Sequence, residues 1–117
     1  MKISDIQTAL NAQLLTPDAD LAHEVHGACG SDMMSDVLAY VKEQGVLLTG
    51  LNNPQVVRTA DMMDMVCIVF VRGKTPDDAL LEMAAQRGIA VLRTTMPMFT
   101  ACGTLYAQGL RGGEAVS

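Results

Sequence analysis

Gly73, Lys74 and Thr75 have the residue types and the position that phosphate binding uses. They follow a hydrophobic run and precede a predicted helix, which is the setting of the phosphate-binding loop in nucleotide hydrolases. The complete loop needs a second glycine five positions before Gly73, and Ile68 stands there inside the predicted strand. The wide amide-lined loop therefore cannot form, and Thr75 is better explained as a helix cap. A simpler role remains, since Arg72 and Lys74 beside a helix N-terminus can hold an anion without hydrolysing anything.

His23, His26 and Cys29 carry the side-chain types of a zinc site. Residues 24–28 are predicted to form a strand, and in a strand side chains three positions apart point to opposite faces. We therefore expect two partly exposed histidines on or beside an edge strand, and no metal site. An iron–sulfur cluster is not expected either, because closely spaced cysteines are absent.

The other reactive side chains form no catalytic group. Cys67 lies in mid-strand among apolar neighbours and Cys102 on an apolar helical stripe, which is typical of inert buried thiols. Cys29 lies near a predicted helix N-terminus, but the sequence offers no His or Asn that would make it a nucleophile. General acid–base catalysis needs a positioned histidine or a perturbed carboxylate pair, and neither is predicted here. We therefore expect a protein that is not an enzyme and that has no cofactor.

The composition indicates one domain that pairs with itself. At 117 residues and 50% hydrophobic side chains the chain can build a single core, with nine Met residues as adaptable filler. The positive mean hydropathy leaves apolar surface exposed, which favours a homodimer through Met-bearing surface. A net charge of −5 argues against nucleic acid as a partner. The apolar run at residues 65–71 is far shorter than the roughly 20 residues of a membrane span, and no signal segment is recognised, so a cytoplasmic location is expected.

The hydrophobic pattern predicts strands that are covered on both faces. Residues 65–71 and 89–93 are apolar runs without polar alternation, as in a parallel sheet with crossover helices. Shorter strands are predicted at 12–15, 24–28 and 46–49. The fold class that follows is α/β, a three-layer single domain with a mostly parallel or mixed sheet and crossover helices.

Capping residues predict where the helices between these strands begin. Ser4 with Gln7 forms a capping-box pattern, and Ser31 or Asp32 opens a second helix. That second helix is predicted from the helical spacing of Met33, Met34, Val37, Leu38 and Val41, with Gly45 as a left-handed C-cap. The later helices are expected to begin at the pairs Asn53–Pro54 and Thr75–Pro76 and after Thr94 to Pro97, the last one ending at Gly109 with Phe99, Cys102, Gly103 and Tyr106 on one face.

Polar residues follow each of the strands that are predicted to be parallel. In such a sheet, ligands bind beyond the carboxyl ends of the strands, where loops meet helix N-termini. Hydroxyls, an amide, a carboxylate and two cations would then gather along one rim, which is a set suited to binding rather than to catalysis. The predicted ligand-binding residues are Ser31, Asp32, Thr49, Asn52, Arg72, Lys74 and Thr94.

At these residues the chain resembles the DRTGG domain family, which is similar in outline to the N-terminal domain of HPr kinase/phosphorylase. The likeness rests on an opening helix like residues 2–6, Ser31-Asp32 with Asp36, Thr49-Gly50, Val71-Arg72-Gly73 with Pro76, and Thr94-Thr95 before Phe99 and Ala101. The chain departs from the motif in two places. Leu51 and Asn52 follow Gly50 where the family often shows Gly-Asp-Arg, and Val71-Arg72-Gly73 stands in place of Thr-Gly-Gly.

The resemblance implies a regulatory or ligand-sensing module in a stand-alone short form, with residues 1–110 as the domain and 111–117 as a flexible tail. Short members of the family are often encoded beside iron-only hydrogenase genes. We therefore expect a non-catalytic module that binds a small anionic ligand, nucleotides included, at the carboxyl ends of the strands. The alternative is a protein-interaction adaptor for a redox or hydrogenase-associated assembly, which would use apolar surface and no small ligand.

Overall fold

The computed structural model describes residues 1–39 and 43–112. Within these residues one five-stranded sheet has the order β1-β5-β4-β3-β2. The strands are β1 (Gln13–Leu14), β2 (Ala28–Gly30), β3 (Val46–Thr49), β4 (Cys67–Phe70) and β5 (Ala90–Arg93). Neighbours from β2 to β5 run parallel, and β1 is antiparallel to β5. The prediction of a mostly parallel or mixed sheet is confirmed.

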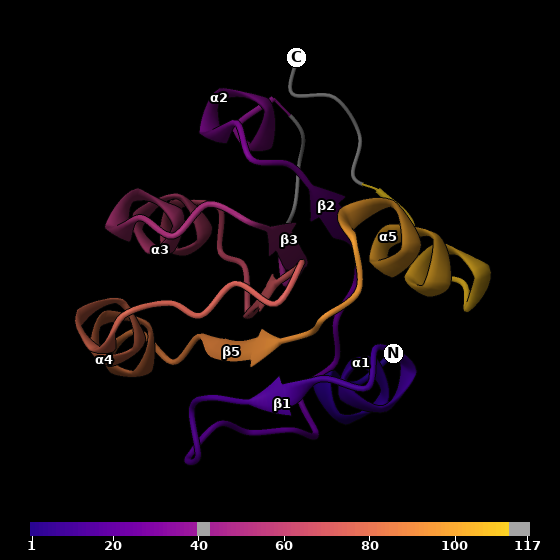
Figure 1. Ribbon diagram of the computed structural model, residues 1–117, viewed down its shortest axis with the longest axis horizontal. Coiled ribbons are helices and arrows are strands. Elements are labelled where there is room, and N and C mark those ends of the chain that lie inside the picture. Colours follow the sequence, from indigo (N-terminus) through magenta and orange to yellow (C-terminus); the bar gives the residue numbers. More distant parts are fainter. Residues whose placement is uncertain (40–42, 113–117) are drawn as a thin grey trace.

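Helices cover both faces of this sheet. They are α1 (Ile3–Ala9), α2 (Met34–Val37), α3 (Pro54–Met62), α4 (Asp78–Gln86) and α5 (Met98–Ala107). Figure 1 shows α2, α3 and α4 on one side of the sheet and α1 with α5 on the other. This is the three-layer α/β arrangement that the sequence predicts. No helix within the described ranges is long and apolar enough to cross a membrane.

Successive residues of the central strands pack alternately into two hydrophobic cores, one on each face of the sheet. Cys67 and Val69 of β4 pack on the side of α1 and α5, whereas Ile68 and Phe70 pack on the side of α2, α3 and α4. All four are fully buried, because side chains alternate between faces along a strand and both faces are covered. The apolar runs of the sequence are unbroken because both faces of these strands are buried.

The start of α3 is confirmed, and the start of α4 is not where the sequence places it. Asn53 caps α3 by accepting a hydrogen bond from the Gln55 amide (2.8 Å), with Pro54 as the first helical residue. The prediction of Thr75 as the cap of the next helix is wrong. Asp77 is that cap, and its carboxylate accepts from the Leu80 amide at 2.9 Å. A carboxylate satisfies a helix N-terminus at least as well as a hydroxyl, so the helix begins two residues later than expected.

The helix predicted after Ser31 is shorter than expected. It comprises Met34–Val37 alone among the described residues, and Val41 lies outside them. The left-handed residue ahead of β3 is Gln44 (φ 56°) and not Gly45. The Gln44 amide donates to the Asp64 carbonyl at 2.7 Å, and this bond to the turn before β4 helps to hold the unusual backbone.

Two predictions near the N-terminus are also corrected. The cap of α1 is Lys2 rather than Ser4, because the Lys2 amide donates to the Asp5 carboxylate at 2.8 Å. The strand predicted at 24–28 is wrong, since β2 begins only at Ala28. His23 therefore lies in a loop, where its Nε2 is 2.7 Å from Oε1 of Gln44. The described residues contain no group of three or more His, Cys, Asp or Glu that could hold a metal ion.

The apolar stripe on α5 faces outward over most of its length. Phe99 is 89% exposed and Tyr106 60% exposed, whereas Ala101 and Leu105 are buried in the core and Met98 and Cys102 pack against it. After α5 the chain turns at Gly109, where the helix is predicted to end, and the φ of this residue is 104°, in the region that favours glycine. Of the predicted tail 111–117, residues 113–117 lie outside the described part. Arg111 is held, because its carbonyl accepts from the Ala28 amide at 2.9 Å and its guanidinium lies 3.8 Å from the Tyr106 ring centre.

Candidate functional site

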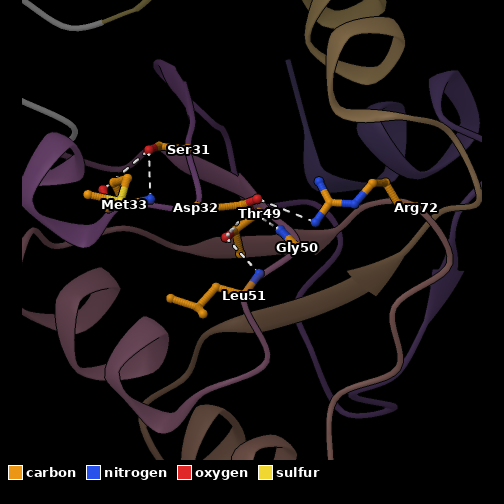
Figure 2. Close-up of polar contacts among 7 residues, drawn as sticks. All are labelled: Ser31, Asp32, Met33, Thr49, Gly50, Leu51 and Arg72. Carbon is orange, nitrogen blue, oxygen red and sulfur yellow. Dashed lines mark hydrogen bonds and ion pairs between the residues drawn. The ribbon is translucent and has the colours of Figure 1, made fainter.

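The Asp32 carboxylate joins the ends of three parallel strands. Its Oδ1 accepts from the Gly50 amide (2.6 Å) and from the Thr49 hydroxyl (3.2 Å), which both belong to the end of β3. Its Oδ2 lies 3.3 Å from Nη2 of Arg72, the second residue after β4. Figure 2 shows these contacts converging on Asp32. Residues from positions 32, 49, 50 and 72 thus form one polar cluster, which we call the Asp32 cluster.

The strand register brings these residues together. Gly30 of β2 pairs with Leu48 of β3, and Thr49 pairs with Phe70 of β4, so that the three strands end at nearly the same level. The Ser31 amide continues the ladder by donating to the Leu48 carbonyl at 3.0 Å. The residues that follow each strand therefore share one edge of the sheet, as expected for the carboxyl ends of parallel strands.

Ser31 positions Asp32 through the turn that leads into α2. The Ser31 hydroxyl oxygen accepts from the Met33 amide (2.9 Å) and donates to the Met33 carbonyl (3.2 Å), as Figure 2 shows. Serine hydroxyls stabilise such turns by local bonds to the backbone two residues on. Ser31 therefore acts here on the backbone beside Asp32 rather than on the carboxylate itself.

Arg72 has an unusual backbone that other loops hold in place. Its φ is 58°, in the left-handed region, and Gly73 follows with a φ of 69°. The Arg72 amide donates to the Met96 carbonyl (2.8 Å) and the Gly73 amide to the Thr94 carbonyl (2.9 Å). Arg93 adds two guanidinium bonds to the Gly73 carbonyl, at 3.1 and 3.2 Å. The loop after β4 is thus bonded to the segment between β5 and α5.

Gly50 lets the Arg72 guanidinium reach Asp32. A Cβ atom at position 50 would collide with Nη2 of Arg72 and would lie 2.6 Å from Cζ. The guanidinium therefore occupies the space that any other residue at position 50 would need. The requirement for glycine here is close approach rather than a left-handed backbone.

These contacts stabilise the charged form of Asp32. The Gly50 amide is the main reason that the pKa of Asp32 lies below its ordinary value, and the Thr49 hydroxyl and Arg72 act in the same direction against the opposing effect of burial. The side chains of Asp32 and Arg72 are 45% and 42% exposed. Both charged groups can therefore be reached from solvent.

The remaining predicted residues have different surroundings. Asn52 links two loops of the same edge, because its Nδ2 donates to the Thr75 carbonyl at 3.3 Å. Lys74 is exposed in the turn that its amide closes onto the Val71 carbonyl (3.1 Å). Thr94 is 2% exposed, and its hydroxyl donates to the Leu10 carbonyl at 2.8 Å. Because that hydroxyl is buried against the end of α1, we leave Thr94 out of the ligand contacts proposed below.

Sequence reasoning names Gly50 in the family motif but does not include it among the ligand-binding residues, and it does not name Arg93 as part of the site. Gly50 donates the shortest bond to Asp32, and Arg93 supports the Gly73 carbonyl. A glycine directly after a buried strand is a signal that could have indicated the first of them. The second gave no separate signal, because an arginine at a strand end is also an ordinary solvated residue.

A separate cleft lies at the opposite edge of the sheet. It has a volume of about 300 Å³ and lies between residues 16–20 and the end of α4, beside Ile89. Ile89 precedes β5, whereas Arg72 and Asp32 follow the strands. The Asp32 cluster and this cleft therefore lie at opposite ends of the parallel strands, and the cleft is not part of the cluster.

The fold and the rim define a three-layer α/β domain with a polar cluster at the carboxyl ends of its parallel strands. The chain belongs to the DRTGG domain family, whose sequence model matches residues 5–107. The resemblance inferred from the sequence is confirmed. A comparison with curated protein sequences gave no match.

Among solved structures, the chain is similar to the CBS and DRTGG domains of the regulatory region of Clostridium perfringens pyrophosphatase, crystallised with its activator diadenosine tetraphosphate. The TM-score is 0.67 over 89% of this chain, at 15% sequence identity. The matched part is 45% of that structure's chain, so this chain spans less than half of its length. At this identity the likeness shows the fold.

Proposed function

We propose that this chain is a non-catalytic regulatory module that binds a small anionic ligand at the rim formed by the Asp32 cluster. The proposal depends on one observation: the half-exposed Arg72 side chain forms an ion pair with the Asp32 carboxylate at the carboxyl ends of the parallel strands. The proposed contacts are Ser31, Asp32, Thr49, Asn52, Arg72 and Lys74.

The charges around the rim favour an anion. The chain has 8 Lys and Arg residues against 13 Asp and Glu, and Arg72, Lys74 and Arg93 lie in or beside the loop after β4. Asp32 is the carboxylate of the cluster, and its charge is compensated by the Gly50 amide, the Thr49 hydroxyl and Arg72. A guanidinium offers five N–H donors, and the bond to Asp32 uses one donor of Nη2. Donors therefore remain for a phosphate or carboxylate.

The exchange of partners at Arg72 gives a mechanism for sensing. An exposed ion pair contributes about 0 to 1 kcal/mol, so an anion can take over the guanidinium at small cost. When Arg72 leaves, Asp32 keeps its hydrogen bonds from the Gly50 amide and the Thr49 hydroxyl. Its carboxylate is therefore not left without hydrogen-bond donors. Because the Arg72 amide is bonded to the Met96 carbonyl, a change at this residue reaches the segment that leads into α5.

Nucleotides are the first ligands to test. Family membership supports a regulatory role, and the similar pyrophosphatase region was crystallised with the activator diadenosine tetraphosphate. A ligand that binds the folded chain alone raises its melting temperature, by about 2.7 kcal/mol of added stability at a hundred times the dissociation constant. We expect adenine nucleotides, diadenosine tetraphosphate or another phosphorylated metabolite to raise the melting temperature of the wild-type chain by several degrees.

Matched variants separate binding at the rim from general charge effects. Arg72→Gln and Lys74→Gln should abolish most of the ligand-induced rise. Arg87→Gln is the control, since it removes the same charge at the C-cap of α4, at the opposite edge of the sheet. If no phosphorylated compound raises the melting temperature at saturation, or if all three variants respond alike, the proposed site is wrong.

The second candidate function is a protein-interaction adaptor for a redox or hydrogenase-associated assembly. The exposed methionines Met33 (61%) and Met62 (69%) on the α2 and α3 side favour it, because flexible apolar side chains suit adaptable contacts. A binding assay with purified hydrogenase maturation proteins tests it. Binding that Met33→Asp and Met62→Asp abolish, together with no response to nucleotides, would replace the first proposal by this one.

We further propose that the module acts as a homodimer in the cytoplasm. A regulatory domain needs a structural change that its ligand can favour, and two alternative arrangements of a dimer provide one. The ligand must then bind the two arrangements with unequal affinity.

A further inference from the structure

From the surface of α5, we propose that this helix forms a symmetric contact with α5 of a second copy of the chain, the two helices crossing at Gly103. This inference names the surface of the proposed homodimer. The regulatory role of this dimer rests on the proposed function, whereas the existence of the dimer does not.

Two aromatic side chains on the outer face of α5 are in water. Phe99 is 89% exposed and Tyr106 is 60% exposed, in a chain with only two Phe and two Tyr. They lie two helical turns apart and therefore point in the same direction. Aromatic residues are the side chains most often found as anchors at interfaces. On the outer face of α5, Phe99 is almost fully exposed, and Tyr106 is covered on one ring face by the Arg111 guanidinium, 3.8 Å from the ring centre.

Gly103 lies between the two aromatic residues and has no role inside the molecule. Nothing lies within 4 Å of the position that its Cβ would take. Its φ is not in the left-handed range, so the backbone does not require glycine. Glycine inside a helix is less stable than alanine, which leaves its presence unexplained by this chain alone. A second backbone that approaches the helix closely at this point explains it.

The spacing of the three residues suits a twofold symmetric contact. In a twofold contact the same patch serves both copies, so a surface must be complementary to itself. An axis through Gly103, with the helices antiparallel, places Phe99 of each copy near Tyr106 of the other, since the two residues are four and three positions from the glycine. The two helix backbones then approach each other closely at Gly103, because no side chain separates them there. The two Phe99–Tyr106 pairs lie on either side of this crossing point.

The absence of charge on α5 also favours a second copy over other faces. No Asp, Glu, Lys or Arg occurs from Thr94 to Leu110, the longest such stretch of the sequence. Two copies with a net charge of −5 each repel one another, and a neutral surface lets them meet without opposing carboxylates. The one charged group described beside this face is the Arg111 guanidinium over the Tyr106 ring, and no carboxylate occurs on the helix.

The area available is consistent with a dimer of moderate affinity. Two Phe and two Tyr side chains at these exposures can bury on the order of 600 Å², and the smaller neighbours Thr100 and Ala107 add to it. Stable interfaces bury about 1,200 Å² or more, so the contact has to extend beyond the aromatic residues along the helix. We expect an equilibrium between monomer and dimer that dilution shifts.

This contact would connect the dimer to the Asp32 cluster. The Met96 carbonyl accepts from the Arg72 amide at 2.8 Å, and α5 begins two residues later at Met98. A ligand that moves Arg72 therefore acts on the segment that orients α5.

Sedimentation velocity and light scattering on the ligand-free full chain test the contact. We expect a concentration-dependent dimer in the wild type. Phe99→Asp should raise the dimer dissociation constant by roughly thirtyfold or more, as for the loss of a central anchor. Gly103→Gln should weaken the dimer as well, while its melting temperature stays equal or rises, because glutamine is the better helix former. Met62→Asp, which replaces a methionine of 69% exposure on α3, is the control and should dimerise normally.

Several outcomes would overturn the proposal. If the wild-type chain is monomeric at the highest soluble concentration, a second copy does not bind the outer face of α5. A dimer that survives both Phe99→Asp and Gly103→Gln, or that Met62→Asp dissociates, has its interface elsewhere. A dimer lost in Phe99→Asp and kept in Gly103→Gln contradicts the crossing at Gly103. None of these results depends on a nucleotide, so failure here is distinct from failure of the ligand proposal.

Discussion

The guanidinium of Arg72 fills the space above Gly50 where any other residue would place its Cβ. This relationship links the loop after β4 to the end of β3, and it lets the Arg72 Nη2 approach the Asp32 carboxylate to 3.3 Å. The position of the proposed ligand-binding cation therefore depends on a glycine of a different loop. A glycine and an arginine separated in sequence act here as one unit.

Gly50→Ala should move Arg72 away from Asp32 while leaving the fold intact. The colliding atoms are the far end of a flexible side chain, which can turn aside. The loss of an exposed ion pair costs about 0 to 1 kcal/mol, and alanine recovers about 0.4 to 1 kcal/mol by restricting the unfolded chain. We expect a free energy of unfolding close to that of the wild type and a crystal structure with a displaced guanidinium. Gly103→Ala, where nothing lies nearby, should leave Arg72 in place.

Two substitutions of Arg72 should separate the backbone from the charge. Arg72→Gly and Arg72→Ala both remove the guanidinium, but only glycine adopts a φ of 58° without strain. The left-handed conformation costs other residues about 1 to 2 kcal/mol, and the greater freedom of glycine in the unfolded chain offsets about 0.4 to 1 kcal/mol of that difference. We therefore expect the glycine variant to be more stable than the alanine variant by about 1 kcal/mol in urea unfolding. An alanine variant more stable than the glycine variant by about 0.4 to 1 kcal/mol would show that the backbone at this position is not strained. Neither variant should respond to an anionic ligand.

The central part of the fold could be predicted from the sequence, and the reason is burial. Strands β3 to β5 read as apolar runs because both of their faces are covered, and Asn53–Pro54 is a local signal for the start of α3. The edge strand β2 was misplaced because it has three residues, of which none is fully buried. The helix after it was overextended, since Met33 and Leu38 fit the helical period and yet are exposed.

The location of the site could be predicted from the sequence, but the contacts between its side chains could not. The rule that loops meet at the carboxyl ends of parallel strands brings Asp32, Thr49 and Arg72 to one edge. The left-handed backbone of Arg72 and its position over Gly50 follow from contacts through space, which spacing along the chain does not reveal. Thr94 satisfies the same rule, but its hydroxyl bonds to Leu10, 84 positions earlier in the sequence.

Thr94→Val should destabilise the chain and leave ligand binding by the folded form unchanged. The Thr94 hydroxyl donates to the Leu10 carbonyl (2.8 Å) and accepts from the Met96 amide (3.2 Å), and valine leaves both groups without this partner. A buried polar group left unsatisfied costs about 1 to 3 kcal/mol. We expect that loss in urea unfolding. Thr95→Val, at the neighbouring exposed residue, should change stability by less than about 0.5 kcal/mol. A normal stability for Thr94→Val combined with lost ligand binding would instead make Thr94 a ligand contact.

Asp32→Asn should remove a part of the stability that depends on pH. The pKa of Asp32 is held below its ordinary value, mainly by the Gly50 amide, so the folded chain binds the proton of this group less readily than the unfolded chain does. This contribution is fully present above about pH 4, the ordinary aspartate range, and is lost as the pH falls through the lower folded pKa. Urea unfolding at a series of pH values should therefore show the wild type above Asp32→Asn at neutral pH, with the gap closing below about pH 4. Asp36→Asn removes an equal charge from the exposed side of α2 and is the matched control. If the difference in free energy of unfolding between the two proteins does not change with pH, the variant is less stable only because a hydrogen bond is lost. The charge of Asp32 would then not stabilise the cluster.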